Sequence, residues 1–121
     1  MENRKEIWTR LGISFRRALE EIHTIISNQR DNQEALMQIR SKEVSIKLIK
    51  SYSRQISKII GANSTSVTLT RLVQRLDILE TIDETNPNEL NQGLKKLHES
   101  LIEIDPIGDS NNFFTTMFEQ L

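Results

Sequence analysis

Seven basic residues in the first two thirds of the chain have the types and spacing that could bind phosphates or other anions. They are Arg40, Lys47, Lys50, Arg54 and Lys58, here called the basic stripe, and Arg71 and Arg75 beyond it. Steps of seven, three, four and four place the stripe within an arc of about 80° on a helix, over about 27 Å. This pattern favours a solvated outer face, which could meet acidic residues of the same chain. Nucleic-acid binding is the first alternative, because spaced cations can neutralise phosphates, although no aromatic residue interleaves with the cations. A face for an acidic protein or for an anionic membrane is the remaining alternative.

The two histidines are the other residues that could take part in catalysis. Arg17 and His23 have the spacing R-x5-H, which is similar to a motif of a large superfamily of helical ribonucleases, where it usually opens a late helix. That similarity implies a helical ribonuclease or toxin as one alternative function. His98 lies beside Leu97 in a charged stretch, and we expect it at the surface.

No other pattern indicates catalysis or a bound metal. The adjacent carboxylates Glu20–Glu21 and Asp83–Glu84 would point about 100° apart on a helix, so neither pair converges as an acid and a base. The sequence has no cysteine, no Gly-rich phosphate loop, no nucleophile elbow and no HExxH motif. We therefore predict a protein that is not an enzyme and that uses no metal, cofactor or small-molecule substrate.

The charge of the chain is divided between its two parts. Residues 1–75 carry 14 Lys and Arg against 7 Asp and Glu, a net of +7, whereas residues 76–121 carry 2 against 10, a net of −8. Opposite charges on two parts of a molecule bear on its partners rather than on its fold. They could pair within one molecule, or one copy could dock its basic face on the acidic face of another.

Long helices must position these residues. The first 86 residues contain no proline, and apolar residues recur at steps of three and four, so the sequence predicts an all-α fold. We expect a single domain, 1–121, built as an up-down bundle of four main helices with a short fifth helix at the C-terminus. The predicted helices cover 1–28, 32–60, 66–84, 87–104 and 110–120. An unbroken helix through 28–32 and a short strand over 65–70 are the local alternatives.

The sequence pattern identifies the start of the fourth helix and the nature of the tail most clearly. Asn86 suits an N-cap and Pro87 the first helical position. The tail is amphipathic and aromatic, and its apolar residues are Phe113, Phe114, Met117, Phe118 and Leu121. Such a segment either caps the core or docks in the groove of a partner protein. We take these five residues as the predicted protein-binding residues.

These observations favour a non-catalytic helical interaction or assembly subunit, or an adaptor, acting in a larger complex or a homo-oligomer. A nucleic-acid-binding subunit that uses the basic stripe is the first alternative. The charged start of the sequence leads into no apolar run, and no stretch approaches the roughly 20 apolar residues that span a bilayer. With the lack of cysteine, this predicts a cytoplasmic, intracellular protein without a membrane span.

Overall fold

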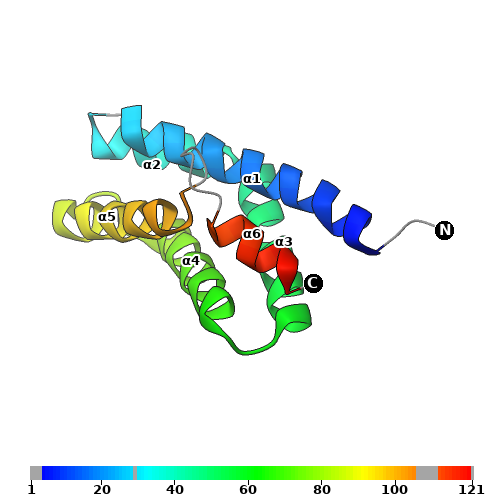
Figure 1. Ribbon diagram of the computed structural model, residues 1–121. Coiled ribbons are helices and arrows are strands. Elements are labelled where there is room, and N and C mark those ends of the chain that lie inside the picture. Colours follow the sequence, from blue (N-terminus) through cyan, green and yellow to red (C-terminus); the bar gives the residue numbers. More distant parts are fainter. Residues whose placement is uncertain (1–3, 29, 106–111, 121) are drawn as a thin grey trace.

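The computed structural model describes the chain over residues 4–28, 30–105 and 112–120, without the side chains of residues 4–9, 11, 112, 115 and 118. Every regular element in these ranges is an α-helix, so the all-α prediction is confirmed (Figure 1). The helices are α1 (Arg4–Asn28), α2 (Asn32–Ser41), α3 (Glu43–Ile60), α4 (Ser64–Thr81), α5 (Pro87–Ile104) and α6 (Asn112–Glu119).

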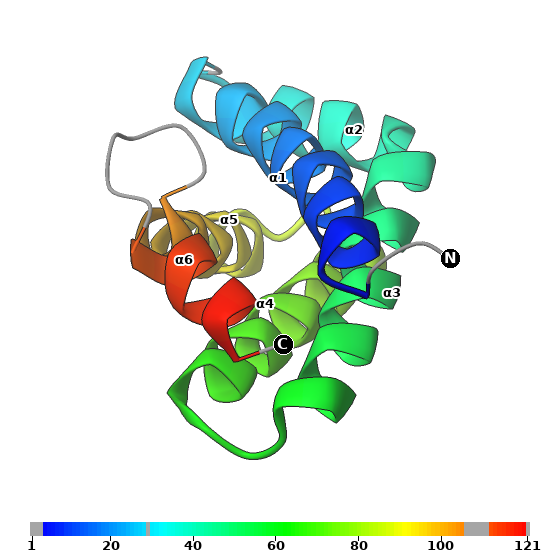
Figure 2. The ribbon, with the colours of Figure 1, turned by 45° about the vertical axis from the view of Figure 1, so that its right-hand side comes forward.

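The longest helix, α1, packs against α2, α3 and α5, while α4 packs against both α3 and α5. Figures 1 and 2 show α4 and α5 diverging from the turn that joins them, with α6 lying between α1 and α4. The core is formed by the inward faces of these helices, and Phe15, Leu19, Leu72 and Leu97 are among its fully buried side chains. The described helices therefore surround one continuous apolar cluster.

The single helix predicted over 32–60 is wrong. Lys42, at φ −93° and ψ 48°, separates α2 from α3. Glu21 of α1 stabilises the break, because its carboxylate accepts a hydrogen bond from Ser45 Oγ at 2.6 Å and pairs with Lys42 Nζ at 2.9 Å. The break lets α2 pack against α5 while α3 packs against α4. No proline or glycine marks this position in the sequence.

The other helix boundaries follow the capping residues. Asn86 accepts hydrogen bonds from the backbone N–H groups of Asn88 and Glu89, and α5 begins at Pro87 as predicted. The preceding helix, α4, begins two residues before its predicted start, because the side chain of Asn63 caps it by accepting from Ser66 N. It ends at Thr81 instead of residue 84. The short strand considered over 65–70 is helical.

The tail helix α6 contributes to the core. Phe114 is 4% exposed and Met117 is fully buried. The Phe114 ring meets that of Phe15 edge to face at a centroid distance of 6.3 Å, and the Arg16 guanidinium lies 5.1 Å from its centroid. Of the predicted protein-binding residues, Phe114 and Met117 are thus held inside the chain. Phe113 is half-buried against the same cluster, whereas the Phe118 side chain and Leu121 lie outside the described residues.

Candidate functional site

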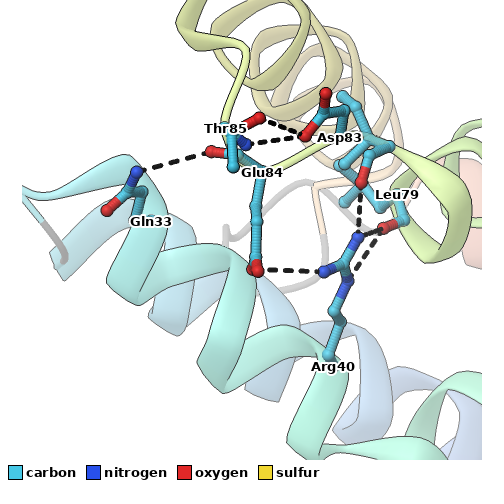
Figure 3. A network of polar contacts seen from close by, with 7 residues as sticks. Gln33, Arg40, Leu79, Asp83, Glu84 and Thr85 are labelled. Atoms are coloured by element: carbon cyan, nitrogen blue, oxygen red, sulfur yellow. Dashed lines mark hydrogen bonds and ion pairs between the residues drawn. The ribbon is translucent and has the colours of Figure 1, made fainter.

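Arg40, the first residue of the basic stripe, is in the last turn of α2, and its guanidinium lies at the C-terminal end of α4. Its guanidinium donates to the carbonyl oxygen of Leu79 at 3.0 and 3.2 Å and to that of Ile82 at 2.8 Å, and lies 3.5 Å from the Glu84 carboxylate (Figure 3). The last carbonyls of a helix have no partner within the helix and carry partial negative charge, so a cation is stabilising there.

The turn between α4 and α5 is also stabilised by a hydrogen bond from α2 and by hydrogen bonds within the turn. Gln33 of α2 donates to the carbonyl oxygen of Glu84, and the Asp83 carboxylate accepts from both the backbone N–H and the hydroxyl of Thr85 (Figure 3). The two bonds from Thr85 lower the pKa of Asp83. Arg40 therefore belongs to a network that joins α2 to the α4–α5 turn, and it lies on a different helix from Lys47, Lys50, Arg54 and Lys58.

Three further cations of the predicted nucleic-acid-binding set also have partners within the chain. Lys50 Nζ lies 2.6 Å from both the Asp77 and Glu80 carboxylates of α4. Partial burial alone would lower the pKa of Lys50, but the hydrogen bonds to these two carboxylates outweigh burial, and the pKa is raised. Arg71 pairs with Glu103 at 3.1 Å, and Arg75 donates to Ser100 Oγ and to the carbonyl oxygen of Lys96. Ion pairs between α3, α4 and α5 thus neutralise part of the opposite charge that the two parts of the chain carry.

The remaining members of the set are Lys47, Arg54 and Lys58, which we call the cationic ridge. Their spacing places them within an arc of about 40° on α3. All three are exposed, and none forms an ion pair with a residue that the structure describes. Lys47 nevertheless lines a cavity together with the carboxylates Glu43 and Glu80. By contrast, no Asp or Glu lines the cavity that Arg54 and Lys58 share.

A groove lies beside these two cations; its larger part is between α3 and α4, and its smaller part is on α4 and the turn that precedes it. It consists of two adjoining cavities, of about 330 and 240 Å³, that share Thr70 and Gln74. We call it the α3–α4 groove. Its lining residues are Ser53, Arg54, Ser57, Lys58, Ala62, Ser66, Val67, Leu69, Thr70, Arg71, Val73 and Gln74. Neither cavity is lined by Asp or Glu, and most of the lining side chains are short.

Ser53 is the unusual residue of this groove. It is 1% exposed, and its Oγ has no hydrogen-bond partner among the described residues. A buried hydroxyl that is left unpaired costs about 1–3 kcal/mol, so such groups are rare and call for an explanation. Ser53 lines the larger of the two cavities, next to Arg54. The groove thus combines a cationic rim, hydroxyl groups and one hydroxyl without a partner.

The structure brings the two histidines together, although the sequence suggested no relation between them. The rings of His23 in α1 and His98 in α5 are 5.7 Å apart, and the Ser27 hydroxyl lies 3.3 Å from His23 Nδ1. Burial, and then the neighbouring His98, lower the pKa of His23, while Asp105 opposes them. Arg17, the other residue of the ribonuclease-like spacing, is exposed.

The described residues contain no cluster of three or more His, Asp or Glu side chains that could hold a metal ion. Within the same ranges, no helix combines the length and apolar character that crossing a membrane requires. No family model matches the chain, and comparisons with curated proteins and with solved structures gave no match. The arguments about function therefore depend on the geometry of this chain.

Sequence reasoning identified the cations of the groove but missed its polar lining. Ser53 and Ser57 lie one turn apart on α3, as do Thr70 and Gln74 on α4. Small polar residues at a spacing of four in two successive helices are the signal that could have predicted a shallow groove between them. The sequence does not reveal which of the seven cations remain unpaired, because the partners of four of them lie about 20 to 45 positions away.

Proposed function

We propose that this chain is a non-catalytic interaction module, a subunit or adaptor in which an up-down set of helices serves as a scaffold for one binding face. The observation that carries the proposal is the α3–α4 groove, with the exposed side chains of Arg54 and Lys58 at its rim and no carboxylate in its lining. An exposed cation that the fold does not neutralise can serve to attract and orient a partner of opposite charge.

The ion pairs within the chain leave part of its acidic surface unavailable to a second copy. The acidic residues that could attract the groove of another copy include Asp77, Glu80, Glu84 and Glu103, and these are already paired with Lys50, Arg40 or Arg71. A contact between copies through these four residues would have to break those pairs, whereas Glu89, Glu99 and Glu119 are exposed and form no ion pair among the described residues. Sedimentation therefore has to distinguish a second copy from a different protein.

A photocrosslinking experiment tests the interaction function. A photoreactive amino acid replaces, one at a time, Lys58 in the groove, Met37 on α2 and Lys95 on α5, all of which are exposed. Irradiation in the cells that make the protein should give a discrete protein adduct from position 58. Adducts from none of the three positions, together with a monomeric mass in sedimentation at every concentration, would contradict the interaction function.

Nucleic-acid binding is the second candidate, because the cationic ridge is exposed and unpaired among the described residues. Neutralising phosphates with cations makes binding fall steeply with salt, by orders of magnitude when many contacts are involved. Fluorescence anisotropy of a labelled single-stranded oligonucleotide at about 50 and 200 mM salt measures this dependence. Only three cations form the ridge, so we expect weak binding that is lost at the higher salt concentration.

A further inference from the structure

We infer that the α3–α4 groove is a docking site for an acidic amphipathic helix of a partner protein, an inference that rests on the interaction function proposed above. Three features carry it: the shape of the groove, the distribution of charge around it, and the unpartnered hydroxyl of Ser53. Each excludes some occupants and favours a helix with carboxylates beside its apolar face.

The dimensions of the groove suit about two turns of a helix. On α4 its lining runs from Ser66 to Gln74, which is about 12 Å at the helical rise per residue. Short side chains such as Ala62, Ser57 and Thr70 line it, and small residues let a third helix approach two others closely. An amphipathic helix in a groove of this kind is a recurring mode of recognition.

Apolar side chains lie along the same path. Leu69 and Val73 form part of the wall of the larger cavity, and Val67, which is 54% exposed, lines the smaller one. A partner that buried Val67 would remove apolar surface from water, which a purely polar ligand would not do. The occupant therefore needs an apolar face in addition to its charge.

The charges at the rim determine which side chains should flank the apolar face of the partner helix. Arg54 and Lys58 lie one turn apart on α3, so they would face carboxylates one turn apart on the partner. Pairing between such exposed charges adds modest affinity, but it fixes orientation and discriminates against basic partners. The lining contains no aromatic side chain on which bases could stack, and this favours a protein over a single-stranded nucleic acid.

Ser53 supplies the polar contact inside the groove. Its Oγ is buried and lacks a hydrogen-bond partner among the described residues, so only rotation of the side chain about χ1 toward the cavity would let it bond to a carboxylate or amide of the partner. A purely structural Ser53 gives a different expectation. In that case Ser53→Ala would remove an unpaired polar group from a helix, leaving stability equal or higher, and would not affect binding.

The test uses a fluorescein-labelled synthetic peptide of about 18 residues, an amphipathic helix with leucines on one face and glutamates on its flanks. A matched peptide carries lysine at each glutamate position. Anisotropy titrations with the full chain at about 50 mM salt should show saturable binding of the acidic peptide and none of the basic one. The Arg54→Glu, Lys58→Glu double variant should weaken binding at least about tenfold, and Ser53→Ala about twofold to tenfold.

The matched control for the double variant is Lys95→Glu, Lys96→Glu, which makes the same change in net charge at exposed positions of α5. Circular dichroism of each variant establishes that it is folded. The groove proposal is overturned if the two double variants weaken binding equally. It is also overturned if both peptides bind alike, or if the oligonucleotide binds through Arg54 and Lys58 while the acidic peptide does not. Photoadducts at position 37 or 95 but not at 58 would overturn the groove and leave the interaction function standing.

Discussion

The tail helix α6 and the outer face of α3 both have sequence patterns typical of binding surfaces, and the fold uses them in opposite ways. The apolar side chains of Phe114 and Met117 in α6 are buried by the chain itself. Arg54 and Lys58 on α3 stay exposed, beside a groove with no acidic lining. Apolar side chains gain free energy in any dry environment, so a chain with a core can absorb them. A cation is buried only with a partner, so Arg54 and Lys58 stay in water unless an external partner covers them.

If α6 is part of the core, truncating its buried face should give a large loss of stability. Phe114→Ala should lower the free energy of unfolding by about 3–5 kcal/mol, because it removes a buried ring and leaves a cavity next to Phe15. Urea denaturation followed by circular dichroism measures the change. Thr116→Ala is the control, since Thr116 is exposed on the same helix. If the two substitutions had equally small effects, α6 would be a free arm and the comparison would fail.

A second prediction compares two cations that sequence spacing assigned to one stripe. Arg40→Met keeps the apolar stem but removes the hydrogen bonds to the last carbonyls of α4, and should cost about 1.5–3 kcal/mol of stability. Lys47→Met, at an exposed position on α3, should change the free energy of unfolding by less than about 0.5 kcal/mol. The same denaturation experiment serves both variants. Equal losses of stability in the two variants would mean that Arg40 stabilises the fold no more than Lys47 does.

The sequence predicts those features of the fold and of the candidate site that local contacts decide. The sequence predicted α5 to the residue, because Asn86, Pro87 and the spacing of Leu90, Leu94 and Leu97 lie within or beside the helix that they specify. It failed at Lys42, because the break is stabilised by Glu21, which lies on another helix. For the candidate site, the periodicity of α3 was enough to predict Arg54 and Lys58. The groove beside them also depends on which side chains α4 places along α3, and the predicted up-down packing did not specify these.

A third prediction isolates the groove cations from the fold. The neutral double variant Arg54→Gln, Lys58→Gln should change the free energy of unfolding by less than about 1 kcal/mol, because both side chains are exposed and without an ion pair among the described residues. Denaturation at about 50 and 500 mM salt should give nearly the same small difference, because the attraction of Lys58 to the C-terminal end of α3, which salt screens, contributes less than about 1 kcal/mol. A larger loss that disappeared at high salt would show that these cations stabilise the fold and would weaken the case for an external partner.

The smallest expected effect concerns pH and distinguishes the histidine pair between α1 and α5 from the α3–α4 groove. The pKa of His23 is lowered from 6.5 by burial and by His98, with Asp105 opposing, so the unfolded chain binds more protons than the folded chain just below pH 6.5. This contribution to stability is complete above that pH and is lost as the pH falls toward the lowered value. The free energy of unfolding should therefore fall between about pH 7.5 and 5.5, and should fall less in His23→Gln, which cannot gain a proton. The hydrogen bonds from Ser45 and then Lys42 lower the pKa of Glu21, so that carboxylate loses its charge below this pH range. A decrease identical in both proteins would therefore assign the pH dependence to groups other than the histidine pair.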